Sequence, residues 1–200
     1  MITQFEQQIL LWVQENLRTD GLNKAASAIS DLGHDGIFWI LLTAALLLTG
    51  LALKFFRSGK YSCHMPVRVS CAGGLGLILS LIITNLTLKK IIARPRPFAA
   101  NPAIEYVGTF ETDTSFPSGH ASASFACAVA ILIVLPKEKK WIGVVLVVIA
   151  SLISLSRIYL GMHYPSDVIA GVLVGVLCGV IAARIVKTVA GKAGGKKQKN

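Results

Sequence analysis

Five long stretches of the chain carry no charged side chain, and each is bounded by Lys, Arg or Asp. A helix needs about 20 predominantly apolar residues to cross the hydrocarbon core of a bilayer. Backbone polar groups find no water there, so a spanning segment satisfies them within a helix. The stretches cover residues 36–53, 69–88, 114–136, 141–156 and 168–183. They predict an all-α fold, an integral membrane helix bundle of about five spanning helices.

The composition supports a membrane protein over other classes. Hydrophobic residues make up 54% of the chain and charged residues only 15%, whereas soluble proteins carry roughly 25% charged residues. These values exclude a soluble globule and a disordered chain, which is rich in charge. Most of the basic residues behind the net charge of +10 lie in the connections between the predicted spans and in the C-terminal tail. We therefore expect a lipid bilayer, and no nucleic acid, as the partner. The four cysteines form no CxxC pair, which predicts neither a disulfide framework nor a zinc site.

The distribution of Lys and Arg predicts the orientation, because these residues stay on the cytoplasmic side of short loops. Five spans place the first and third connections and the C-terminal tail on one face, and the basic residues concentrate there. They are Lys54, Arg57, Lys60, Arg68, Lys137, Lys139, Lys140, Arg184, Lys187, Lys192, Lys196, Lys197 and Lys199. We therefore expect a multi-pass protein of the plasma (inner) membrane with a cytoplasmic C-terminus.

The chain divides into three predicted regions. Residues 1–35 contain apolar side chains every four positions from Phe5 to Leu17, which indicates an amphipathic helix, and a second one follows. We expect these N-terminal helices to lie at the outer interface or to pack on the bundle. Residues 36–190 form the membrane domain, and the Lys- and Gly-rich residues 191–200 are predicted to be a disordered basic cytoplasmic tail.

Several polar residues lie at span ends that the predicted topology brings to the outer face. Ionisable residues at such positions are candidates for function. The candidates are Lys89, Arg96, Ser118, Gly119, His120, Arg157, His163 and Asp167.

These residue types suit phosphoryl transfer, which depends mostly on positioning and on neutralising phosphate oxygens. Lys89, Arg96 and Arg157 can supply positive charge, and the arginines can bind phosphate bidentately. Ser118 and Gly119 precede a predicted helix, so their N–H groups are expected to point at a bound anion.

Two histidines permit a covalent route, in which one imidazole attacks phosphorus and the other protonates the leaving oxygen. Asp167 follows His163 by four residues and is expected to hold that imidazole in the nucleophilic tautomer.

Each feature also has a purely structural interpretation. Basic residues near span ends anchor helices at the membrane interface, and Pro-Ser-Gly before a helix is ordinary capping chemistry. A lone histidine near the interface can be structural, and Arg157 with Asp167 can form a simple ion pair. Their combination on one face, where little else is charged, favours a site.

The candidates also fall into three ordered motifs. These are Lys89, six residues and Arg96-Pro97; then Pro117-Ser118-Gly119-His120; then Ser156-Arg157, five residues, His163, three residues and Asp167. With them the chain resembles the type 2 phosphatidic acid phosphatase family, which is related to vanadium haloperoxidases and bacterial acid phosphatases. The motifs cover residues 89–167, and the span pattern extends the resemblance to about residue 190.

The resemblance implies roles for these positions. His163 would be the nucleophile that forms a phosphohistidine, Asp167 its orienting carboxylate, and His120 the general acid. A phosphate clamp of Lys89, Arg96 and Arg157 would be completed by Ser118 and Gly119. The family implies a metal-independent reaction without a cofactor. Arg94 lies outside the motif, which implies a secondary role, and membrane members commonly have six spans where this chain shows five plus an amphipathic start.

We therefore expect a lipid phosphatase acting at the outer leaflet on a phosphate monoester or diphosphate. Undecaprenyl diphosphate is the first choice of substrate, with phosphatidylglycerophosphate, phosphatidic acid and diacylglycerol pyrophosphate as alternatives. A catalytically silent lipid-phosphate-binding protein would lack a histidine or a clamp residue, and none is missing. An anion transporter would carry charges at mid-span and broken helices in repeated halves, and the mid-span segments lack Asp, Glu, Lys and Arg.

Overall fold

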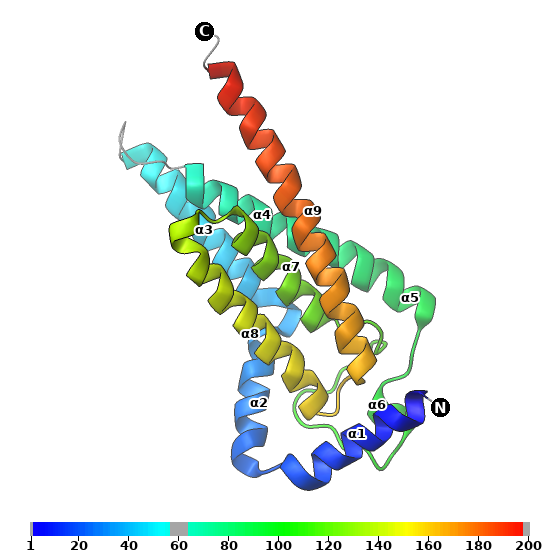
Figure 1. Cartoon of the computed structure of the whole chain (residues 1–200). Helices are drawn as coiled ribbons and strands as arrows, with labels where there is room; N and C mark the ends of the chain where they lie inside the picture. The colour runs from blue at the N-terminus through cyan, green and yellow to red at the C-terminus, as the bar shows by residue number, and fades with distance from the viewer. Residues whose placement is uncertain (1, 57–63, 198–200) are drawn as a thin grey trace.

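The structure, a computed structural model, describes residues 2–56 and 64–197, and all regular elements in these residues are helical (Figure 1). The longer helices are α1 (Ile2–Leu17), α2 (Asp20–Leu32), α3 (Ile37–Phe56), α4 (His64–Ser80), α7 (Gly119–Val134), α8 (Lys140–Tyr159) and α9 (Pro165–Lys197). Shorter pieces are the π-helix η2 (Leu81–Leu88), the helices α5 (Lys89–Ile92) and α6 (Pro97–Ala100), and the 3-10 turns η1 (His34–Gly36) and η3 (Lys137–Lys139). The predicted all-α class is confirmed.

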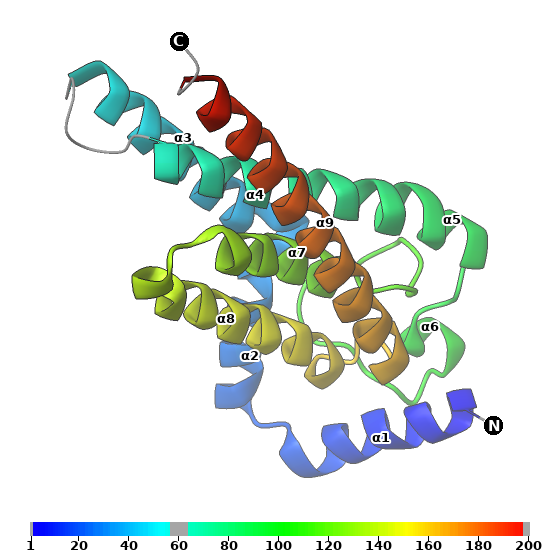
Figure 2. The same ribbon diagram turned by 45° about the horizontal axis from the view of Figure 1, so that its top comes forward.

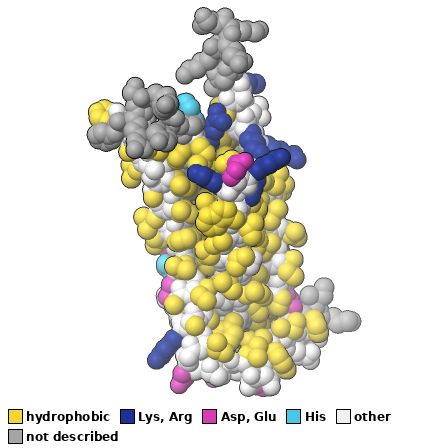
Figure 3. Space-filling model, turned by 60° about the vertical axis from the view of Figure 1, so that its left-hand side comes forward, with side chains coloured by type: hydrophobic (Ala, Val, Ile, Leu, Met, Phe, Trp, Pro, Cys, Tyr) yellow, Lys and Arg dark blue, Asp and Glu magenta, His cyan; other side chains and the backbone are white. Residues whose placement is uncertain are grey.

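Four helical stretches within the described residues are long and apolar enough to cross a membrane. They are Asp20–Phe55, His64–Ala100, Lys137–Tyr159 and Pro165–Lys192. The fifth expected span corresponds to α7, a shorter apolar helix of 16 residues. Hydrophobic side chains cover the middle of the face in Figure 3, and Lys and Arg gather near the end from which the C-terminus projects. This pattern is that of a membrane helix bundle.

Helix α7 occupies the centre of the bundle because its neighbours present glycine to it. Gly171, Gly175 and Gly179 recur every four residues on α9, and a Cβ atom at each would lie within 2.8 Å of an α7 carbonyl oxygen. Small residues at this spacing allow helix backbones in a membrane to approach closely. Gly76 on α4 makes a similar approach to the carbonyl of Ala126. Close backbone packing against α9 and α4 therefore holds α7 on two sides.

The helix bounds refine the sequence-based expectation. The third spanning helix was expected to begin at the Pro117–His120 motif, and α7 begins at Gly119, after the Ser118 cap. The fourth helix extends to Tyr159. The last helix continues to Lys197, where a disordered tail was expected from residue 191.

The N-terminal helices pack on the bundle. Figure 2 shows α1 lying across the end of the molecule that also holds α6, and α2 leading from it to α3. Arg18, in the turn between α1 and α2, donates from Nε and Nη2 to the carbonyl oxygen of Tyr159, at 3.2 Å each. Gln14 bonds the long loop before α7 by accepting from the Glu105 amide at 2.9 Å. These bonds attach α1 to the end of α8 and to the loop that carries site residues.

Candidate active site

A widened helical segment positions the first clamp residue. The eight residues of η2 form a π-helix, and the N–H of Lys89 donates to the carbonyl of Thr84, five residues earlier. Such segments are rare and occur often at functional sites. The helix ends at Ala93, whose φ of 46° is left-handed, and the chain then turns back through Arg94 and Arg96. The turn brings all three basic side chains to one end of the bundle.

The three predicted clamp cations share two carboxylates of one loop, Glu111 and Asp113. Lys89 pairs with Asp113, and Arg96 pairs with both acids. Arg157, on α8, donates from Nη2 to Glu111 Oε1 at 2.6 Å. All three cations are buried, with 8% of Lys89 and 3% of each arginine exposed. The structure thus brings together the three residues that the sequence placed in one clamp.

Glu111 and Asp113 remain ionised because of these cations. Burial alone would raise the pKa of Glu111, but the charges of Arg157 and Arg96 outweigh it and hold the pKa below its ordinary value. Burial likewise opposes ionisation of Asp113, and hydrogen bonds from Lys89 and Arg96 lower its pKa. Sequence reasoning missed both acids, since an acidic loop residue carries no signal of its partner. The two carboxylates therefore neutralise part of the charge of the three cations.

His163 lies in the turn between α8 and α9 and is 1% exposed. Its Nδ1 is 2.8 Å from the carbonyl oxygen of Ser115. A carbonyl only accepts, so Nδ1 carries the proton and the lone pair is on Nε2. Arg96 Nη1 lies 3.4 Å from that Nε2. Burial lowers the pKa of His163 to about 4, Arg157 and Arg96 add to this, and Asp167 opposes it. The imidazole is thus neutral at neutral pH, with a free lone pair on Nε2.

Asp167 contacts His163 through an intermediary, which differs from the expected direct bond. The Asp167 Oδ2 to His163 Nδ1 distance is 3.7 Å, too long for a hydrogen bond. The same oxygen accepts from Ser115 Oγ at 2.5 Å and from the Tyr164 amide at 2.9 Å. Ser115 therefore orients the imidazole through its carbonyl, and Asp167 fixes Ser115. The sequence held no signal for Ser115, which lies outside the three motifs.

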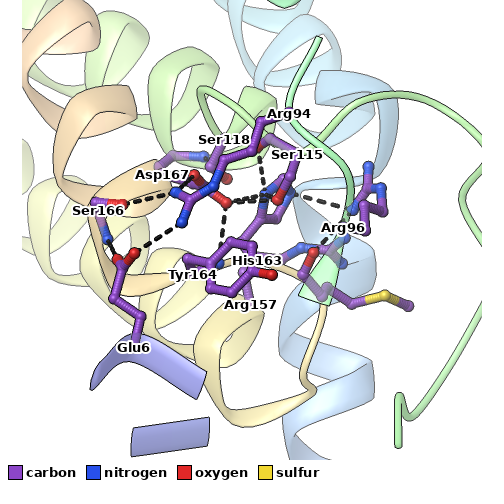
Figure 4. A network of polar contacts seen from close by, with 12 residues as sticks. Glu6, Arg94, Arg96, Ser115, Ser118, Arg157, His163, Tyr164, Ser166 and Asp167 are labelled. Carbon is purple, nitrogen blue, oxygen red and sulfur yellow. Dashed lines mark hydrogen bonds and ion pairs between the residues drawn. The ribbon is translucent and has the colours of Figure 1, made fainter. Parts of the chain in front are cut away.

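Arg94 joins Asp167 to the N-terminal helix (Figure 4). It donates to Asp167 Oδ1 at 2.6 Å and to Glu6 Oε2 at 2.7 Å, and its guanidinium lies 3.8 Å from the ring centre of Tyr164. The other oxygen of Glu6, Oε1, accepts from the Ser166 amide at the start of α9, at 2.7 Å. Glu6 is 4% exposed. Sequence reasoning gave Arg94 a secondary role and missed Glu6, because a Glu on an amphipathic helix resembles a solvated residue.

The start of α7 supplies the remaining predicted residues. The Ser118 hydroxyl caps the helix by accepting from the Ala121 amide at 3.5 Å. The backbone N–H of Ser118 donates to the Asp167 carbonyl at 2.9 Å. The expectation that the Ser118 N–H points at a bound anion is therefore wrong, since it is already used. Gly119 lies beside Lys89: a Cβ there would be 3.8 Å from the Lys89 Nζ. His120 Nε2 is buried and has no hydrogen-bond partner among the described residues.

A cavity of about 800 Å³ connects this polar cluster to the apolar interior between α3 and the α4–η2 helix. Its polar end is formed by Lys89, Glu111, Asp113, Gly119 and His120. Its apolar part is lined by Ile40, Leu77, Ile78, Leu81 and Ala123. The cavity thus has the two chemical environments that a phosphate group on a hydrocarbon chain requires.

The sequence suggested no metal site, but the fold brings one possible set of ligands together. Among the residues that the structure describes, His34, Glu111 and His120 place their ligand atoms within 4.8 Å of one another.

Comparison with known proteins agrees with this architecture. A sequence model of the PAP2 superfamily matches residues 71–190. An undecaprenyl-diphosphatase of Sulfolobus acidocaldarius is 33% identical over 155 residues, which cover 76% of this chain and 65% of that protein. The phosphatidylglycerophosphatase B of Bacillus subtilis is 30% identical over 168 residues, covering 78% and 70%. Across three such curated relatives the matched region spans between 48% and 65% of the relative's own length.

A solved structure supports the fold independently. The crystal structure of a transmembrane PAP2-type phosphatidylglycerolphosphate phosphatase from Bacillus subtilis superposes with a TM-score of 0.67 at 26% identity. The match covers 96% of this chain and 87% of that one. The chain is a membrane helix bundle, and it belongs to the PAP2 superfamily.

Proposed function

We propose that this protein is a membrane lipid phosphatase that acts through a phosphohistidine intermediate. The observation that carries the proposal is the cavity whose polar end, with Lys89 and His120, continues into an apolar part between helices. Behind its lining acids Glu111 and Asp113 lie Arg96 and Arg157, which pair with them. A lipid phosphate fits such a space, because its head needs the cations and its chain needs the apolar walls.

In the first step Lys89, Arg96 and Arg157 hold the phosphate, whose oxygens take the place of the Glu111 and Asp113 carboxylates. His163 Nε2 attacks phosphorus while Nδ1–H remains bonded to the Ser115 carbonyl. The N–P bond forms as the bond from phosphorus to the leaving oxygen breaks, and His120 gives that oxygen a proton.

In the second step a water molecule attacks the phosphohistidine. His120, now without its proton, accepts one from the water as the O–P bond forms and the N–P bond breaks. Inorganic phosphate leaves, and both histidines return to their starting states. The reaction requires no metal, because Lys and Arg carry the charge stabilisation that a metal supplies in other phosphatases.

Undecaprenyl diphosphate is our first choice of substrate, since relatives with that printed activity match most of the chain. Phosphatidylglycerophosphate, phosphatidic acid and diacylglycerol pyrophosphate are the alternatives, because the clamp contacts phosphate and not the tail. The concentration of Lys and Arg at the opposite end favours a site on the outer face of the plasma (inner) membrane and a cytoplasmic C-terminus.

The test is phosphate release from a panel of these lipids by the purified protein in detergent, with EDTA present. We expect hydrolysis by the wild type and none above background by His163→Ala. His64→Ala is the matched control, since His64 is exposed at the start of α4, far in sequence from the site. A wild type without activity on any lipid phosphate, or a His163→Ala variant near the wild-type rate, would contradict the proposal. Loss of activity in EDTA would contradict its metal independence.

A further inference from the structure

Three residues from separate segments meet beside the cavity. His34 comes from η1 before α3, Glu111 from the long loop, and His120 from the first turn of α7. Their ligand atoms lie within 4.8 Å of one another, and the ring centres of the two histidines are 6.4 Å apart. Neither His34 nor Glu111 belongs to the motifs that define the family resemblance.

The ligand set has a definite chemical preference. Two imidazoles and one carboxylate are a common set for Zn²⁺, which binds three protein ligands and leaves a fourth position open. Mg²⁺ and Ca²⁺ take oxygen ligands instead. Zinc–ligand bonds of about 2.1 Å in tetrahedral geometry place ligand atoms about 3.4 Å apart. The three side chains must therefore close by roughly an ångström, which the His34 side chain, 46% exposed, has room to allow.

Two further observations point to a ligand. His120 Nε2 is buried without a hydrogen-bond partner among the described residues, a costly state that a bound cation would relieve. Glu111 is already supported in the way that metal ligands are, since Arg157 donates to its Oε1 at 2.6 Å.

We propose that His34, Glu111 and His120 form an inhibitory site for a borderline divalent cation of the Zn²⁺ type. The site stands on the geometry alone, and its inhibitory role rests on the function proposed above. The bound ion coordinates the lone pair of the His120 imidazole. The coordinated nitrogen then carries no proton for the leaving oxygen. It also holds Glu111 against Arg157 and Arg96, so a phosphate cannot replace that carboxylate. Inhibition is therefore competitive with phosphate anions.

The binding experiment uses the full-length protein, carried in detergent without a polyhistidine tag, and Co²⁺ as a spectroscopic probe for the Zn²⁺ site. Wild type and His64→Ala should develop the intense visible absorption of four-coordinate Co²⁺, which added Zn²⁺ removes. His34→Ala should lose at least nine tenths of that absorption. Absence of the absorption in the wild type, or equal absorption in His34→Ala, would overturn the site.

The activity experiment tests the inhibitory role. Zn²⁺ should inhibit wild type and His64→Ala equally, raising KM with little change in kcat, and Mg²⁺ at the same concentration should have no effect. In His34→Ala the inhibition constant should rise at least tenfold while the metal-free rate stays within about twofold. Cobalt binding without zinc inhibition of an active enzyme would overturn the inhibitory role. If no lipid phosphate is hydrolysed at all, the proposed function fails, and the Co²⁺ spectrum still decides the site.

Discussion

The two sides of the site are built differently. On the side of His163, the proposed nucleophile, Asp167 receives bonds from Ser115, Tyr164 and Arg94, and Arg94 is in turn paired with buried Glu6. On the clamp side, the cations are paired with carboxylates from a loop, and the Asp113 side chain is 51% exposed. We call the first side locked and the second side exchangeable. The proposed covalent route depends on this division, because the attacking imidazole must stay fixed while phosphate groups enter and leave.

Removing His120, the proposed general acid, should have the largest effect, and that effect should differ between substrates with poor and good leaving groups. His120→Ala should lower the rate on a lipid phosphate by about 10²–10⁴-fold, the usual contribution of a positioned acid. The nucleophile side is untouched, so a substrate with a good leaving group, such as a nitrophenyl phosphate, should still phosphorylate His163. Burst kinetics and trapping of the phosphoprotein measure this. Equal losses on both substrates would show that His120 supports the nucleophile instead.

Breaking the locked side should cost stability as well as activity. Arg94→Ala removes the cation that pairs with the buried Glu6 and Asp167 carboxylates. Loss of one member of a buried ion pair costs about 3–5 kcal/mol. Denaturation of the purified variant in mild detergent, followed by tryptophan fluorescence, measures the change. A double variant in which Glu6→Gln accompanies Arg94→Ala should recover part of the loss. Unchanged stability in Arg94→Ala would mean that α1 is not locked to the site.

The pH profile reports the nucleophile side in isolation. The pKa of His163 is lowered to about 4, so the neutral imidazole persists at any pH above that value. The ratio kcat/KM should therefore lose about tenfold per unit as the pH falls below about 4, since the protonated ring has no lone pair. A fall in kcat/KM that begins near the ordinary histidine pKa of about 6.5 would mean that His163 is solvated in the free enzyme.

The smallest effect is expected on the exchangeable side. Asp113→Asn removes a half-exposed carboxylate that competes with phosphate for Lys89 and Arg96. Water screens the half-exposed carboxylate in its pairs with the buried Lys89 and Arg96, so its competition is on the order of 1 kcal/mol. KM and the inhibition constant of orthovanadate should fall by about fivefold or less, with kcat unchanged. Titration with orthovanadate provides the measurement. Weaker vanadate binding would indicate that Asp113 positions the cations and does not compete for them.

Much of this protein follows from local patterns in its sequence. The uncharged stretches predict a helical membrane bundle because a spanning backbone has to satisfy its own hydrogen bonds. The spacing of Lys89, His120, Arg157 and His163 relative to span ends places them at one end of the bundle.

Tertiary structure decided how those residues are held. Glu6 and Arg94 are 88 positions apart, and Glu111 and Ser115 lie in a loop without periodicity, so no local signal links them to their partners. Ser118 was expected to offer its N–H to an anion, but the turn before α9 uses that group. Periodicity and spacing report on one helix at a time. Which donor meets which acceptor depends on how separate elements pack, and glycine contacts such as those of Gly175 with α7 determine that.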